Sequence, residues 1–259
     1  MMLRHSLLAG LAALSLMAAG CATTGPNAPL SAEAVAAQAA AIAASSRPQA
    51  DRDRDTARRA AETLAFTRVQ PGWRVADLMT GGGYFARLFA ETVGPEGRVY
   101  TWQAGEFIAY QASYGDGLRT VDAAYENVTG TDQKAVDLIL PENLDLVFTA
   151  QNYHDLHLPS FPAGTANHMN RAVFEALKPG GLYVVIDHSA QAGAGLGVAD
   201  ELHRIDVADV KREVLAAGFV LDAESEALAN PADPRTASVF DDSIKGQTDQ
   251  FMLRFRKPG

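Results

Sequence analysis

The chain has 259 residues, of which 47% are hydrophobic and 20% charged, and this ordinary globular composition excludes a disordered chain, a collagen-like fibre and a coiled coil. Its 22 basic and 31 acidic residues give a net charge of −9, which argues against broad nucleic-acid binding, because that binding needs cations to displace phosphate counterions. Cys21 is the single cysteine, so neither an intrachain disulfide nor a metal site built from cysteines can form.

The first twenty residues have the pattern of an export signal. Arg4 precedes an apolar run over residues 7–19, which has signal-peptide length and is too short for a permanent membrane span. Small residues then precede Cys21, an arrangement that resembles a bacterial lipoprotein signal. We therefore expect residues 1–20 to be a lipoprotein signal peptide and Cys21 to be lipidated; a plain secretory peptide is the alternative.

Such a protein would be lipid-anchored on the periplasmic side of a bacterial cell envelope, and Ala22 leaves sorting to the outer membrane open. Residues 21–50 are rich in Ala, Ser, Thr and Pro, whose side chains bury little apolar area. They predict a spacer, with a helix over SAEAVAAQAAAIAASS. The remaining residues, 51–259, are expected to form one folded domain.

From residue 51 onward, helical patterns alternate with short apolar strands. The predicted helices span residues 51–66, 84–93, 105–114, 118–125, 163–177 and 207–217. The predicted strands span residues 74–78, 98–102, 144–149, 182–187, 219–221 and 250–255. Unbroken apolar strands between helices indicate a parallel sheet covered on both faces. We therefore predict an α/β fold of three layers, with a doubly wound, Rossmann-like sheet of seven mostly parallel strands and an antiparallel edge strand.

A glycine-rich segment follows the first predicted strand. Asp77 ends that strand, and Gly81, Gly82 and Gly83 connect it to the helix that begins at Tyr84. Three consecutive glycines are entropically costly, and they make sense where the backbone turns tightly or approaches a ligand. Ligands bind beyond the carboxyl ends of the strands in such sheets, and the helix N-terminus offers N–H groups there. The sequence thus predicts a binding loop; a tight turn without a ligand is the alternative.

Four motifs recur in the expected order along residues 71–259: DLMTGGGYF, PEGRVYTWQ, LDLVFTAQNYHDL and FEALKPGGLYVVID. With them the chain resembles a class I S-adenosylmethionine-dependent methyltransferase. YHDL, LHRID and TDQFMLRFRKP look, more narrowly, like a group of secreted bacterial proteins labelled predicted methyltransferases. The resemblance implies S-adenosylmethionine as the cofactor and methyl transfer as the activity, and we expect the acceptor to be a small molecule.

The resemblance also implies the cofactor-binding residues. They follow the first, second and fourth strands and comprise Asp77, Met79, Thr80, Gly81, Gly82, Gly83, Tyr84, Gln103 and Gln151. Two of them depart from the family pattern, because Met79 replaces the first glycine of the loop and Gln103 replaces the acidic residue that accepts the ribose hydroxyls. Glu106, three residues later, is a candidate substitute for that acid.

The candidate catalytic residues follow the fourth and fifth strands. Methyl transfer is an in-line displacement that needs alignment, and it needs a general base only when the acceptor carries a proton. His154 is the first candidate for that base because an imidazole titrates near neutral pH, and His188, beside Asp187, is the second. A purely structural role for each histidine is the alternative.

Two other functions stay open. Met79, Gln103 and the export signal suggest a noncatalytic, ligand-binding lipoprotein that keeps the fold. A metal-dependent enzyme is suggested by imidazoles and carboxylates, the usual ligands of divalent ions, at His154, Asp155, His157, Asp187, His188, His203 and Asp206. No metal-binding spacing such as HExxH occurs, so no metal is expected. Arg204 could hold an anionic substrate, whereas Asp206 is favoured as a helix cap.

Overall fold

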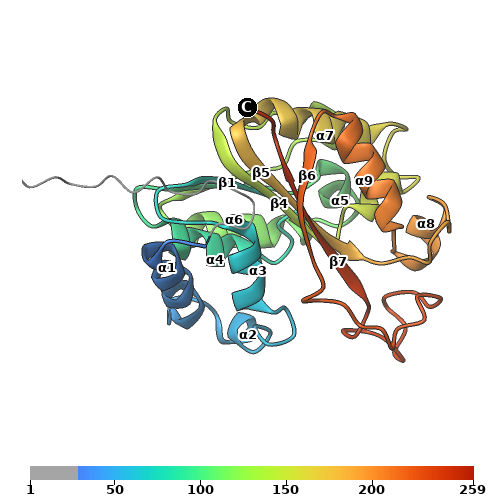
Figure 1. Ribbon diagram of the computed structural model, residues 1–259, viewed down its shortest axis with the longest axis horizontal. Coiled ribbons are helices and arrows are strands. Elements are labelled where there is room, and N and C mark those ends of the chain that lie inside the picture. Colours follow the sequence, from blue (N-terminus) through green and yellow to red (C-terminus); the bar gives the residue numbers. More distant parts are fainter. Residues whose placement is uncertain (1–28) are drawn as a thin grey trace, which may run out of the picture.

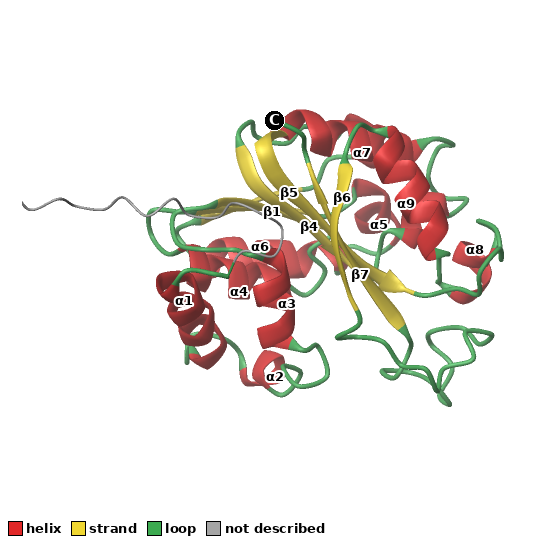
Figure 2. Ribbon diagram, viewed as in Figure 1, coloured by secondary structure: helices red, strands yellow, loops and turns green. Residues whose placement is uncertain are grey.

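The computed structural model describes residues 29–259, so the expected signal peptide and Cys21 lie outside the described residues. One sheet has the strand order β3-β2-β1-β4-β5-β7-β6. Figure 2 shows the strands of this sheet in yellow, with β1, β4, β5, β6 and β7 labelled. Its strands are β1 (Arg74–Leu78), β2 (Arg98–Trp102), β3 (Val128–Thr131), β4 (Leu144–Ala150), β5 (Leu177–His188), β6 (Val220–Ser225) and β7 (Gln250–Arg256). β1 to β5 pair in parallel, and β7 runs antiparallel to its neighbours β5 and β6. The predicted α/β class and the seven-stranded sheet are confirmed.

Helices cover both faces of the sheet and give three layers (Figure 1). One layer contains α1 (Ala32–Ala43), α3 (Ala60–Thr67), α4 (Tyr84–Val93) and α6 (Tyr114–Ala124), with α2 (Gln49–Arg52) at its end. The other contains α5 (Gly105–Tyr110), α7 (Thr165–Ala176) and α9 (Val207–Ala216), with α8 (Val198–Leu202) beside it. Two 3-10 turns are η1 (Ala135–Asp137) and η2 (His154–His157). Among the described helices, none has the length and apolar character needed to span a membrane.

The central strands are buried on both faces. Val75 of β1 packs with Leu88 of α4, whereas its neighbour Ala76 joins the core that contains Val173 of α7. Successive strand residues point to opposite faces, so both must be apolar when helices cover both sides. This is why the central strands are continuous apolar runs in the sequence.

The structure departs from the predicted helices and strands where the sequence lacks a regular spacing of apolar residues. β1, α4 and β2 have the predicted bounds, but β3 was not predicted, because its residues VTGT form no apolar run. The helix predicted over residues 51–66 is wrong in its first half, where a turn over residues 53–59 separates α2 from α3. This half is almost wholly charged, and its charges pair with distant residues, as in the ion pair between Asp51 and Arg87.

The expected spacer is partly packed on the domain. α1 begins after Ser31, whose hydroxyl accepts the Ala34 N–H, and the helix lies against α4. Ala34 and Ala41 are fully buried, because their small side chains allow close approach. Gln38 Nε2 donates a 2.7 Å hydrogen bond to the Val69 carbonyl. The described residues from Ser31 onward therefore belong to the folded domain.

Candidate functional site

A cavity of about 190 Å³ opens at the carboxyl edge of the sheet, between β1 and β4. Its lining comes from the two strand ends, the glycine loop and the turn before α3: Arg54, Arg58, Asp77, Leu78, Met79, Thr80, Gly81, Gly82, Tyr84, Phe85, Ala150, Gln151 and Asn152. The strand order reverses between β1 and β4, which is where open α/β sheets bind ligands. Small-molecule sites usually start at about 300 Å³, so this cavity suits one part of a ligand.

The glycine loop is shaped for a close backbone approach. Met79 and Gly81 have positive φ angles of 50° and 55°, and the Met79 carbonyl accepts a 3.0 Å hydrogen bond from Asn152 Nδ2 after β4. At Gly83, φ is 81° and an added Cβ would lie 2.2 Å from Val121 Cγ2, so no side chain fits. A methionine in the left-handed region is strained, and such strain is concentrated at functional sites.

Asp77 supplies a buried carboxyl group to this cavity. Its Oδ2 atom has no hydrogen-bond partner among the described residues. Burial raises the pKa of Asp77 to about 7, although Thr80 and the positive charge of Arg58 oppose the shift. An unpartnered buried carboxyl group is costly, so Asp77 is suited to receive a hydrogen-bond donor or a cation from a ligand.

Arg54 and Arg58 face the cavity from the turn before α3, and no motif in the sequence points to them. The Arg58 guanidinium lies 5.1 Å from the centre of the Tyr84 ring. Burial and the nearby Arg54 lower the pKa of Arg58 to about 10, so it remains cationic at neutral pH. Asp55 holds the turn in place, because it pairs with the buried Arg47 and accepts a 2.6 Å hydrogen bond from the Tyr84 hydroxyl.

The two residues expected near a ribose make other contacts. Gln103 is buried, and its Oε1 accepts a 3.0 Å hydrogen bond from the Gly81 N–H. The Glu106 carboxylate accepts the N–H of Ala135 at 3.1 and 3.2 Å. α6 covers the glycine loop beside them, since a Cβ added at Gly117 would lie 1.8 Å from the Gly81 carbonyl oxygen. Gln103 thus fixes the shape of the loop in this structure.

The three predicted catalytic residues lie together after β4 and at the end of β5. Asp187 is fully buried and accepts the backbone N–H groups of His154 and His188, both at 2.7 Å. It also contacts His154 Nδ1 at 2.9 Å, while His154 Nε2 lies 3.2 Å from Asp155. Burial opposes protonation of His154, but Asp187 and Asp155 outweigh it and raise the pKa of His154 to about 10. A protonated imidazole has no lone pair with which to accept a proton.

The other polar residues that the sequence points to each contact a different partner. Burial lowers the pKa of His188 to about 4, and its Nδ1 lies 2.7 Å from Thr248 Oγ1. His157 Nε2 lies 3.2 Å from a carboxylate oxygen of Glu213. Asp206 accepts the N–H of Ala208 and so caps α9, as predicted. Arg204 does not lie over a cleft, because it is fully buried in an ion pair with Asp233.

Comparisons with known proteins agree with this fold. No family model matches the chain. Demethylmenaquinone methyltransferase of Listeria monocytogenes is 28% identical over 130 residues, 49% of this chain, and the chain spans about half (50%) of that relative's length. A SAM-dependent methyltransferase from Aquifex aeolicus has a TM-score of 0.54 at 18% identity, over 76% of this chain and 88% of the other. A possible exported protein from Bordetella parapertussis has a TM-score of 0.50 at 18% identity, over 80% and 68%. The chain therefore has the fold of class I S-adenosylmethionine-dependent methyltransferases.

Proposed function

We propose that the chain is an S-adenosylmethionine-dependent methyltransferase that holds the amino-acid end of its cofactor in the cavity between β1 and β4. The observation that carries this proposal is the pairing of Asp77, a buried carboxyl group with an unpartnered oxygen, with the cationic Arg58 in one small cavity. An ionised Asp77 and the cationic Arg58 would complement the ammonium and carboxylate groups of an amino acid, and an ammonium group beside Asp77 favours its ionised form. The methyltransferase fold and the demethylmenaquinone methyltransferase relative support the choice of cofactor.

The residues present fit this part of the cofactor. Asp77 would accept hydrogen bonds from the ammonium group, and Arg58 would donate to the carboxylate. S-adenosylmethionine, when bound, supplies a methyl group on a sulfonium centre. The chain's task is then alignment of a small-molecule acceptor. His154, which contacts Asp187, begins η2 two residues after Asn152, the last residue that lines the cavity.

Isothermal calorimetry with S-adenosylmethionine, S-adenosylhomocysteine and methionine tests this proposal. Asp77→Asn and Arg58→Gln should each weaken binding about tenfold or more, because each removes a charge-assisted hydrogen bond. Arg59→Gln is the matched control, since Arg59 is exposed and pairs with Glu62. No heat from the wild-type protein at millimolar ligand would reject the cofactor, and equal binding by all variants would reject the assigned residues.

A noncatalytic ligand-binding protein is the second candidate. The small cavity and the engagement of Gln103 by Gly81 favour it. Methionine should then bind as tightly as S-adenosylmethionine, because the nucleoside would add no contacts. Methyl transfer to any offered acceptor would exclude this candidate.

We also propose that the protein is anchored by lipid on Cys21 at the periplasmic side of the envelope. The charged start, the apolar run over residues 7–19 and the small residues before Cys21 support this, and one protein of the same fold is described as a possible exported protein. Cys21→Ser should move the protein from the membrane fraction to the soluble fraction. Membrane association that survives this substitution would contradict lipidation of Cys21.

A further inference from the structure

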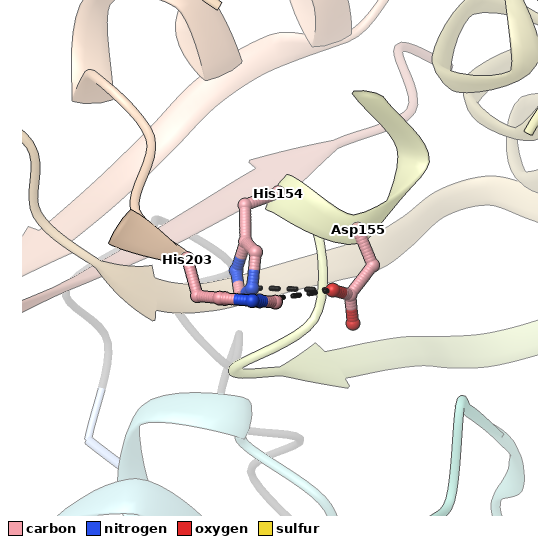
Figure 3. Close-up of side chains that lie close together, drawn as sticks. All are labelled: His154, Asp155 and His203. Atoms are coloured by element: carbon pink, nitrogen blue, oxygen red, sulfur yellow. Dashed lines mark ion pairs between the residues drawn. The ribbon is translucent and has the colours of Figure 1, made fainter. Parts of the chain in front are cut away.

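We propose that His154, Asp155 and His203 form a binding site for a divalent transition-metal ion such as Zn²⁺. One ligand atom from each side chain lies within 4.8 Å of the other two (Figure 3). His154 and Asp155 come from η2, and His203 follows α8, so the site joins segments that are about fifty residues apart. This inference goes beyond methyl transfer and does not depend on it.

The distances suit one ion shared by three ligands. Asp155 Oδ1 lies 3.2 Å from His154 Nε2 and 3.9 Å from His203 Nδ1. Two ligand atoms each about 2.1 Å from a tetrahedral ion are roughly 3.4 Å apart. The pair from η2 already has this spacing, and a small movement of the His203 ring completes the set.

Asp187 gives His154 the support that metal-bound histidines require. Its carboxylate contacts His154 Nδ1 at 2.9 Å and is itself held by the backbone N–H groups of His154 and His188. A carboxylate on one ring nitrogen fixes the tautomer and turns the other nitrogen toward the metal. Here that other nitrogen is Nε2, the atom that faces Asp155.

His203 leaves the site accessible to an ion. Its side chain is 28% exposed, against 4% for His154 and 14% for Asp155. Its backbone has a positive φ of 53°, and its ring contacts the exposed ring of Phe240 edge-on at 4.8 Å. Three protein ligands leave a fourth position for water or another oxygen or nitrogen ligand.

The ligand set also indicates the class of ion. Two imidazoles and one carboxylate suit Zn²⁺, Co²⁺ or Ni²⁺ better than Mg²⁺ or Ca²⁺, which prefer oxygen ligands. Binding of the ion displaces one proton from the site. The ion takes the place of the Nε2 proton that His154 presents to Asp155, and that proton passes to solvent.

Equilibrium dialysis of the full chain against Zn²⁺, with elemental analysis, tests the site. The wild-type protein should retain one equivalent, and His203→Gln should lower the affinity at least tenfold. His168→Gln is the matched control, because His168 is exposed on α7 and should leave affinity unchanged. Both variants have the same N-terminal residues as the wild-type protein, so any binding there contributes equally to all measurements.

Two further measurements, each made on variants whose circular dichroism matches that of the wild-type protein, separate loss of a ligand from loss of folding. Asp187→Asn should weaken Zn²⁺ binding about 10–100-fold, as loss of a supporting carboxylate does elsewhere. Co²⁺ bound to the wild-type protein should give visible absorption bands that His203→Gln alters, while both proteins keep the same circular dichroism. Equal Zn²⁺ affinity in the wild-type and His203→Gln proteins, or no retained metal in either, would identify the cluster as an ion-pair network only.

Discussion

At the scale of single residues, the raised pKa of Asp77 in the candidate site makes the stability of the protein depend on pH. A carboxyl group buried without a full set of partners disfavours ionisation, and burial raises its pKa to about 7. The unfolded chain ionises Asp77 near pH 3.9, so the folded protein holds this proton over a pH range in which the unfolded chain has lost it. The contribution of the protonated Asp77 carboxyl group to the free energy of unfolding is therefore complete below about pH 4 and is lost as the pH rises to about 7.

We predict that Asp77→Asn removes this pH dependence. The free energy of unfolding of the wild-type protein should fall between pH 5 and pH 8, whereas that of the variant should not show this fall. The difference between the two proteins therefore grows with pH, by up to about 4 kcal/mol over the full titration. Urea unfolding at the two pH values measures the difference. Asp122→Asn, on the exposed side of α6, is the control and should shift stability equally at both pH values. The same behaviour from Asp77→Asn would contradict a raised pKa.

The candidate site could be predicted from the sequence only in part, for a physical reason visible at Asp77 and Arg58. Asp77 and the glycines follow a strand directly, so a local pattern locates them. Arg58 lies in a charged stretch with no apolar periodicity, and its place beside Asp77 depends on contacts made far along the chain. The contact between Gln103 and Gly81 likewise depends on how β1 and β2 lie together, which no single motif encodes.

At the scale of elements, the turn over residues 53–59 is the piece that completes the cavity. Arg47 is fully buried, and its guanidinium forms two hydrogen bonds with the Asp55 carboxylate, at 2.6 and 2.9 Å. The same carboxylate accepts a hydrogen bond from Tyr84 at the start of α4. The turn is thus held by charge pairing instead of by an apolar helical face, and this explains why a helix prediction fails there.

Asp55→Asn should therefore destabilise the protein by about 3–5 kcal/mol, because it removes the carboxylate with which the buried Arg47 guanidinium forms its ion pair. Urea unfolding measures the loss, and hydrogen exchange should become faster over residues 53–59. Glu62→Gln is the control: its pair with Arg59 is exposed, and its loss should cost less than about 1 kcal/mol. Equal losses from the two variants would show that the buried pair does not hold the turn.

At the scale of the whole molecule, the mostly parallel sheet between two layers of helices was the part of the fold most accessible to prediction. Continuous apolar strands separated by helices require two covered faces, and the structure has them. The limits of the domain were less accessible. Residues 31–50 look like a spacer because alanine-rich sequence buries little area per residue, yet those same small side chains allow α1 to pack closely on α4.

Two truncations separate these interpretations of residues 31–50. Removing residues 1–30 leaves all of α1, whereas removing residues 1–50 deletes α1 and also Arg47, the partner of Asp55. The longer truncation should lose at least about 3 kcal/mol relative to the shorter one, because it uncovers α4 and leaves Asp55 unpaired. For a domain of this size, that loss corresponds to a Tm lower by about 6–12 °C, measurable by calorimetry. Equal Tm values for the two proteins would mean that residues 31–50 serve as a spacer and that the folded unit begins at residue 51.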